Sequence, residues 1–401
     1  MAPETPSLDF DHYHQVELPR LLAEGRGALA AADDLEAIGA LAFRLPSGSA
    51  YTYRPIPGGV AVEPGEASAR VVVELAPHLW ADLVRDLESA SGLLYSGRVT
   101  LRRGSGMRFV RWEPGLRALY HGRRVFDPDT VDLRDAAGSP LDPHQHFRLG
   151  DDRDAMAHFL RTAGFLLVKD VFRADEIAGM REAALSEERG ARPGDQRSWW
   201  GKNAEGESLL CRVTRCDEVP AFRGLPTDPR IAGLAALSHL PMVPRAEQTE
   251  DGVSVLIKNP SMAEGLSDLP WHRDCGMGGH ASMCPVLVFS IYLYPGRPET
   301  GELRVLPGSH VASLGFIDAT DPRAPRGISL AADPGDVSLH YSDVMHAAPP
   351  PTGDGPFRKC VLVNYARPDA YNHRGDQSYN DVLLGRDDGQ VEHLEKVAER
   401  A

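Results

Sequence analysis

The sequence predicts an α+β protein: a C-terminal double-stranded β-helix (jelly roll) with flanking helices, preceded by a smaller α+β domain. The chain has 401 residues, which is enough for two domains with separate cores. Its second half contains many short apolar runs separated by Gly and Pro, a pattern typical of a sandwich or barrel. Its first half mixes helical and strand patterns. We therefore expect an accessory domain at residues 1–145 and the β-helix at residues 146–401.

The accessory domain is expected to contain short strands and several helices, without a constellation of metal ligands or a nucleophile. Leu and Ala recur at helical spacing over residues 1–40, and a further helix is expected over residues 112–121. Residues 92–109, followed by 114–119, resemble the end of a sterol-carrier-like module, in which a strand and a terminal helix close an apolar tunnel. A packing or dimerisation domain is the alternative.

The second domain is expected to begin with helices and to continue as strands. The amphipathic pattern over residues 175–188 predicts one of these helices. The run at 286–294 is almost continuously apolar, which favours a central strand. The remaining strand patterns lie at residues 253–258, 302–306, 335–341 and 359–365.

A candidate metal site follows from a His-x-Asp pair and a distant histidine. His272 and Asp274 are two residues apart, so both project to the same side of an extended chain, while Arg273 points away. His346 follows a predicted strand and can reach the pair across a barrel mouth. Two imidazoles and one carboxylate, with coordination positions left open, form the facial triad that binds Fe(II) in oxygenases. His340 is a competing distal ligand, less favoured because it lies inside an apolar strand.

Three cationic positions suggest where anions bind. Arg358 opens the last predicted strand, where its side chain is expected beside His346, and a guanidinium can bind a carboxylate through two parallel hydrogen bonds. The segments 199–202 and 212–215 are expected to be loops over the mouth of the barrel. Their cations would then meet an anionic substrate, unless they are ordinary surface features.

Composition excludes several classes of function. A net charge of −14 argues against a nucleic-acid surface, and no apolar run is long enough to span a membrane. The N-terminus lacks the basic and apolar regions of a signal peptide. The five cysteines form no Cys-x-x-Cys pair, which favours a reducing, cytoplasmic location. The oligomeric state is left open.

Four motifs together resemble a known family. They are the apolar run at 165–172, the Trp-His-Arg-Asp at 271–274, the segment 300–310 with its Leu-Pro-Gly-Ser-His turn, and the segment 334–358 that ends at the arginine. With these motifs in this order, the chain from about residue 150 to 370 resembles the phytanoyl-CoA dioxygenase family of Fe(II)/2-oxoglutarate-dependent oxygenases.

The resemblance implies His272, Asp274 and His346 as iron ligands and Arg358 as the partner of the distal carboxylate of 2-oxoglutarate. It implies O2 as the second cosubstrate and a small molecule as the substrate, oxidised with release of succinate and CO2. In iron halogenases the carboxylate ligand is absent. The presence of Asp274 therefore favours hydroxylation, or a related desaturation or ring closure.

The resemblance also implies supporting residues. A polar residue on the strand before the His-x-Asp pair helps to hold the cosubstrate, and Lys258 or Asn259 occupies that position. Tyr292 and Ser290 share one face of the central strand and are expected to line the cavity, with packing as the alternative. Many family members have a hydroxyl residue two positions after the distal histidine, where this chain has Ala348.

Two other interpretations stay open at this point. The β-domain would be a jelly-roll metal-binding module or a cupin-like isomerase without oxygen chemistry, although Arg358 and the Pro-Gly-Ser-His turn argue against both. A degenerate family member would keep the fold and lack turnover. The Arg-, Ala- and Gly-rich composition suggests a bacterium with a high-GC genome and a role in specialised metabolism.

Overall fold

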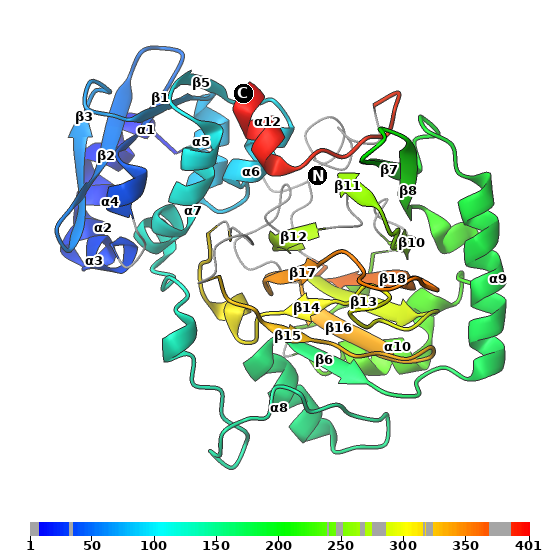
Figure 1. Ribbon diagram of the computed structural model, residues 1–401. Coiled ribbons are helices and arrows are strands. Elements are labelled where there is room, and N and C mark those ends of the chain that lie inside the picture. Colours follow the sequence, from blue (N-terminus) through cyan, green and yellow to red (C-terminus); the bar gives the residue numbers. More distant parts are fainter. Residues whose placement is uncertain are drawn as a thin grey trace.

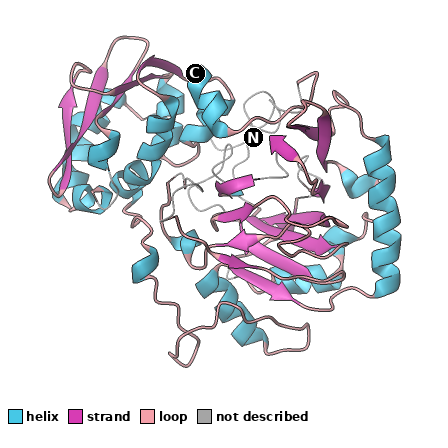
Figure 2. Ribbon diagram, viewed as in Figure 1, coloured by secondary structure: helices cyan, strands magenta, loops and turns pink. Residues whose placement is uncertain are grey.

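The protein has two parts that lie side by side, shown in Figures 1 and 2. The first is built on a five-stranded sheet, and the second on a nine-stranded and a four-stranded sheet. The predicted α+β class with a C-terminal jelly roll is confirmed. The computed structural model describes residues 8–31, 35–238, 240–245, 252–264, 269–274, 286–315, 317, 324–368 and 386–401.

The N-terminal unit, residues 8–121, begins with short helical segments and continues into the five-stranded sheet. The strand order is β3-β2-β1-β4-β5, with β1 and β4 parallel and the other neighbours antiparallel. The helices are α1 (Phe10–His12), a π-helical turn (Tyr13–Glu17), α2 (Leu18–Ala23), α3 (Arg26–Ala30) and α4 (Leu35–Ile38). The strands are β1 (Leu41–Arg44), β2 (Ala50–Ile56), β3 (Gly59–Pro64), β4 (Val71–Glu74) and β5 (Thr100–Arg103).

Three further helices complete this unit: α5 (Pro77–Val84), α6 (Ala90–Tyr95) and α7 (Gly106–His121). Helix α7 is longer than predicted and ends at Gly122, whose φ of +67° suits a glycine C-cap. Aromatic side chains dominate the core, with Tyr53, Trp80 and Trp112 fully buried. The predicted sterol-carrier likeness stays a prediction.

The C-terminal helix α12 (Leu394–Arg400) returns to this unit and not to the jelly roll. Its residue Ala398 is buried in the same core as the aromatic side chains of the N-terminal unit. The approach is close: a Cβ on Gly106, at the start of α7, would lie 2.8 Å from the carbonyl oxygen of Ala398. The boundary predicted at residue 145 stays a prediction. Helix α12 falls in the predicted second domain by sequence, but it packs in the core of the N-terminal unit.

Helices cover the outer face of the larger sheet of the second part (Figure 2). They are α8 (Arg153–Ala163), α9 (Ala174–Gly190) and α10 (Pro229–Ala235). Helix α8 starts where the Asp152 carboxylate accepts hydrogen bonds from two backbone N–H groups, and it ends at Gly164 with φ +88°. Among the described residues, no helix is long and apolar enough to cross a membrane.

Among the described residues, eight strands form the jelly roll, four in each of its two sheets. In the larger sheet the order is β10-β18-β13-β16, and in the smaller sheet it is β12-β17-β14-β15. The larger sheet is extended by β6 (Phe165–Val168), β7 (Ser198–Asn203), β8 (Ser208–Val213), β9 (Val243–Pro244) and β11 (Met262–Glu264). The jelly-roll strands are β10 (Val253–Ile257), β12 (Leu269–His272), β13 (Val286–Tyr292), β14 (Arg304–Val305), β15 (Ile328–Ser329), β16 (Val337–Tyr341), β17 (His346–Ala348) and β18 (Lys359–Ala366).

Alternation along β13 and β16 separates a packing face from a site face. Phe289, Ile291 and Leu339 belong to the core that also contains the apolar side chains of α8, α9 and α10. The alternate positions, which include Tyr292 and His340, face the smaller sheet. The polar side chains of the larger sheet therefore lie between the two sheets, where a jelly roll holds its ligand.

The prediction that residues 199–202 and 212–215 form loops was wrong. Most of them belong to strands β7 and β8, which pair with each other and extend the larger sheet. Trp199 is buried, and the Arg212 guanidinium lies 4.9 Å from the centre of its ring. Arg212 Nε also donates a 2.9 Å hydrogen bond to Ser254 Oγ. Arg212 is thus a fixed part of the sheet and not a surface cation on a loop.

Candidate metal centre

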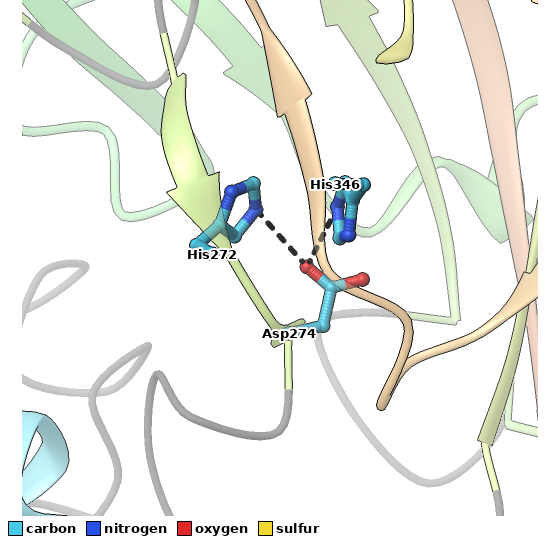
Figure 3. Close-up of side chains that lie close together, drawn as sticks. All are labelled: His272, Asp274 and His346. Carbon is cyan, nitrogen blue, oxygen red and sulfur yellow. Dashed lines mark ion pairs between the residues drawn. The ribbon is translucent and has the colours of Figure 1, made fainter. Parts of the chain in front are cut away.

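The three predicted ligands come together because two short strands of the smaller sheet pair directly. Strands β12 and β17 are antiparallel, and their register places His272 opposite His346, with ring centroids 4.2 Å apart. The chain leaves β12 after His272, and the backbone N–H of Asp274 donates a 3.1 Å hydrogen bond to Ser342 O. Figure 3 shows the carboxylate lying between the two imidazoles.

The distances suit a single metal ion. Asp274 Oδ1 lies 3.5 Å from His272 Nε2 and 3.6 Å from His346 Nε2 (Figure 3). One ligand atom from each of the three residues lies within 4.8 Å of the others. Ligand atoms bound to one ion at about 2.0–2.2 Å are roughly 3 Å apart, so a small contraction around an ion would complete the site. A donor set of two imidazoles and one carboxylate is the set that Fe(II) takes in oxygenases.

Backbone carbonyls fix the orientation of both imidazoles. His272 Nδ1 lies 2.8 Å from Pro270 O, and His346 Nδ1 lies 2.9 Å from Val344 O. Because a carbonyl only accepts, each Nδ1 carries the proton and each Nε2 is left with its lone pair. Such bonds set the tautomer and the ring orientation of metal-binding histidines. Both Nε2 atoms face the carboxylate of Asp274.

The protonation states also suit a cation. Burial lowers the pKa of His346 to about 3, with a further contribution from the neighbouring His272. Burial of Asp274 opposes its ionisation, but the neighbouring imidazoles, in the protonated form that they take at acid pH, outweigh burial and hold the pKa of this carboxyl well below its usual range. At neutral pH the site therefore offers a neutral His346 and an ionised Asp274, the forms in which these residues bind metals.

The competing distal ligand, His340, lies on the far side of the carboxylate. Its Nε2 is 3.7 Å from Asp274 Oδ2, and its ring centroid is 4.6 Å from that of His346. Among the described residues, neither of its ring nitrogens has a hydrogen-bond partner. Since Asp274 Oδ1 faces the other two histidines, His340 is placed to contact the second carboxylate oxygen and not the ion.

A pair of variants separates the two possible distal ligands. We expect His340→Leu to lower the affinity for Mn(II), an Fe(II) substitute, by less than about 100-fold, the usual range for residues outside the ligand set. We expect His346→Leu, the matched control on the next strand, to remove Mn(II) binding. Electron paramagnetic resonance of free Mn(II) measures both. Equal losses in the two variants would contradict the preference for His346.

Two buried cations lie beside the metal centre. Arg358, the residue before β18, is buried, and among the described residues its Nε has no hydrogen-bond partner. Lys258 accompanies it: its backbone N–H donates to Arg358 O at 2.9 Å, and its Nζ donates to Ala348 O at 2.7 Å. Ala348 is two residues beyond His346, so the two cations lie next to a ligand-bearing strand. This arrangement fits a dianionic cosubstrate with one carboxylate distant from the ion.

Glycines make room for these long side chains. A Cβ on Gly301 would lie 2.5 Å from Lys258 Cγ, and a Cβ on Gly296 would lie 2.6 Å from the ring of Tyr292 and 3.3 Å from Arg358 Cδ. Burial raises the pKa of Tyr292 to about 12, against the opposing influence of Arg358. The tyrosine thus stays a neutral hydrogen-bonding group.

Asn259 and Ser338 complete the polar residues of this region. The side-chain amide of Asn259 donates to Leu210 O at 2.5 Å, and its predicted part in holding the cosubstrate stays a prediction. Ser338, whose hydroxyl lies 3.2 Å from that of Tyr292, was missed. The sequence pattern that could have identified Ser338 is the alternation along β16, which puts its side chain on the same face as that of His340.

Comparison with solved structures finds several similar proteins. The chain is 28% identical to EvdMO1 over 53% of this chain and 50% of that one, with a TM-score of 0.43. It is 27% identical to AviO1 from Streptomyces viridochromogenes Tue57, covering 56% of this chain and 98% of that one, with a TM-score of 0.44. It is 21% identical to the non-heme alpha-ketoglutarate-dependent epimerase SnoN from nogalamycin biosynthesis, covering 55% and 83%, with a TM-score of 0.45. The chain thus spans half the length of EvdMO1.

Comparison with protein families gives a match across the jelly roll. No curated protein matches the sequence. The phytanoyl-CoA dioxygenase family matches residues 160–360, a range that contains the triad, both buried cations and the strands that carry them. The resemblance inferred from the motifs is confirmed. The chain belongs to the phytanoyl-CoA dioxygenase family, whose members are oxygenases that use Fe(II), 2-oxoglutarate and O2.

Proposed function

We propose that this oxygenase hydroxylates an unactivated C–H bond of a small molecule and converts 2-oxoglutarate to succinate and CO2. One oxygen atom of O2 enters the substrate as a hydroxyl group, and the other enters succinate. The observation that carries this proposal is the complete triad with two buried cations, Arg358 and Lys258, beside it. A metal-binding module without oxygen chemistry has no need of two buried cations next to its metal.

The three ligands have separate roles in the proposed reaction. His272 and His346 present their Nε2 lone pairs in orientations fixed by backbone carbonyls. Asp274 supplies the one negative charge of the ligand set, and its presence leaves no place for a halide, which favours hydroxylation over halogenation. Bound Fe(II) supplies the activation of O2 and the oxidation of the C–H bond.

The cosubstrate is held by residues on the larger sheet. We assign the distal carboxylate of 2-oxoglutarate to Arg358, whose planar guanidinium suits two parallel hydrogen bonds. Lys258 provides a second positive charge where other family members have a hydroxyl residue, because its Nζ reaches the carbonyl of Ala348. The hydroxyl groups of Tyr292 and Ser338 donate or accept hydrogen bonds on the same face of the larger sheet, and burial strengthens each of these polar contacts.

The setting of the reaction is inferred from composition and from the cysteines. The composition supports a tailoring step in bacterial specialised metabolism. A cytoplasmic location is consistent with Cys211, Cys216 and Cys360, which are buried free thiols. Hydroxylation is preferred over desaturation or ring closure only because it is the simplest outcome of oxygen insertion.

An anaerobic titration tests the core of the proposal. Addition of 2-oxoglutarate to the Fe(II)-loaded protein is expected to produce the weak visible charge-transfer band of the chelated keto acid. A screen of candidate substrates is then expected to find compounds that stimulate succinate release in air. The absence of the band in metal-loaded protein would favour a jelly-roll metal-binding or cupin-like protein. A band without succinate release under any condition would indicate a degenerate member.

A further inference from the structure

A buried ionic network joins the N-terminal unit to the strands that carry the metal ligands. In the part of the chain that the structure describes, the network contains three cations and three anions. Within it, Arg117 Nη2 lies 2.7 Å from Asp86 Oδ1 and 3.3 Å from Glu113 Oε1. The members are Asp86, Glu113, Arg117, Arg123, Arg273 and Asp343, whose side chains are between 4% and 15% exposed.

Arg273 is the link between the two parts. Its Nη2 donates to Glu113 Oε1 on helix α7 at 3.1 Å, and its Nη1 lies 3.8 Å from Asp343 Oδ1. Glu113 is itself fixed, because its other oxygen accepts a 3.0 Å hydrogen bond from the backbone N–H of Ala90. Arg273 therefore connects a rigid helix of the N-terminal unit with the segment between β16 and β17.

The positions of these residues in the chain give the network its significance. Arg273 lies between the ligands His272 and Asp274 and points to the opposite side of the chain. Asp343 lies three residues before the third ligand, His346. Arg123, which follows α7, adds a second link, with its Nη2 3.3 Å from Asp343 Oδ2. Both segments that carry ligands are thus tied to the N-terminal unit.

Energetics favours a geometric role over a general stabilising one. Removing six charges from water is costly, and apolar residues of similar size often stabilise a buried site equally well or better. Charged groups instead restrict the side chains to the one arrangement in which every charge is paired, because an unpaired buried charge is strongly disfavoured. Metal sites depend on such support, since ligands must be held within about 0.5 Å of the productive geometry.

We propose that the N-terminal unit supports the metal centre. Glu113 and Arg273 are positioning residues, which hold the His272–Asp274 segment at the distance needed to share an ion with His346. This proposal rests on the proposed function, because it requires that the triad binds a metal.

The test measures metal affinity apart from turnover. Mn(II) is titrated into the full-length apoprotein, and the free ion is followed by electron paramagnetic resonance. Glu113→Gln, which keeps the shape but removes the charge, is expected to raise the Mn(II) dissociation constant at least about tenfold, as loss of support for a ligand does. Glu113→Asp, which keeps the charge on a shorter side chain, is expected to fall between Glu113→Gln and the wild type.

The control is a second buried ion pair of the same unit. Glu88 and Arg98 lie 2.6 Å apart, with the Glu88 side chain fully buried. Glu88→Gln is expected to lower the melting temperature but to leave the Mn(II) dissociation constant within about twofold, since the metal centre keeps its outer support.

Each outcome decides between the claims. If Glu113→Gln and Glu113→Asp lower the melting temperature as the control does while Mn(II) binds as in the wild type, the positioning role is overturned. If Glu113→Gln does not fold, as judged by circular dichroism, the comparison of Glu113→Asp with Glu88→Gln decides. Failure of the wild type to bind Mn(II) would overturn the proposed function as well.

Discussion

The Asp274→Ala variant is expected to form succinate at least about 100-fold more slowly than the wild type, because removal of a metal ligand exceeds the 10- to 100-fold effect of outer residues. It is also expected to lose the visible band with Fe(II) and 2-oxoglutarate. The physical reason is the position of Oδ1, which lies 3.5 Å and 3.6 Å from the Nε2 atoms of the two histidines. The measurement is succinate release from the reconstituted enzyme with a stimulating substrate.

Asp333→Asn is the matched control for this variant. Asp333 is a half-exposed carboxylate of the same part of the protein, paired with Arg297 and Lys169 at its surface. Its loss is expected to leave succinate formation within about twofold, since exposed ion pairs contribute little. Succinate formation by Asp274→Ala at the rate of this control would show that the carboxylate is not a ligand.

The Arg358→Gln variant is expected to raise the KM for 2-oxoglutarate by roughly 10- to 150-fold, the equivalent of a charge-assisted hydrogen bond of about 1.5–3 kcal/mol. Lys258→Met, which removes the neighbouring cation, is expected to act in the same direction. Because neither residue is a ligand, both variants are expected to keep Mn(II) binding. Steady-state kinetics with varied 2-oxoglutarate gives the KM, and the metal titration gives the comparison.

Arg173→Gln serves as the control for these two cations. Arg173 lies at the start of α9, where Nη2 is 3.1 Å from Asp175 Oδ2 and both side chains are exposed. The KM of this variant for 2-oxoglutarate is expected to stay within about twofold of the wild type, since exposed ion pairs contribute little. A KM unchanged in both Arg358→Gln and Lys258→Met would contradict the assignment of the distal carboxylate to these two cations.

The structure brings the three predicted ligands together, and only part of the signal for this is local. His272 and Asp274 are separated by one residue, which predicts that they project to the same side of an extended chain. Strand β12 ends at His272, however, and the hydrogen bond from Asp274 N to Ser342 O completes their placement. The strand over residues 286–292 is predicted from its apolar character. The offset of Arg358 from His346 puts the arginine just before the last strand, β18, which belongs to the larger sheet, whereas β17 belongs to the smaller one. The order of elements in a jelly roll is enough for these two inferences.

Other features depend on contacts that no local pattern reveals. Arg273 was predicted to point away from the metal, and it does, but nothing in the sequence indicates that Glu113, far earlier in the chain, receives it. The contact of Lys258 with the carbonyl of Ala348 depends equally on how β10 and β17 meet. Trp199 and Arg212 were assigned to loops because Gly and charged residues interrupt their strands and hide the alternation.

The return of α12 to the N-terminal unit has a consequence for how the molecule unfolds. The two units are joined by the covalent chain twice, once at the linker after α7 and once through residues 386–401. Unfolding of the N-terminal unit would expose the apolar side of α12. Unfolding of the jelly roll would leave α12 connected to the N-terminal unit only through an unfolded segment of chain. Each unit therefore depends on the other for part of its stability, which favours loss of both in one cooperative event over sequential melting.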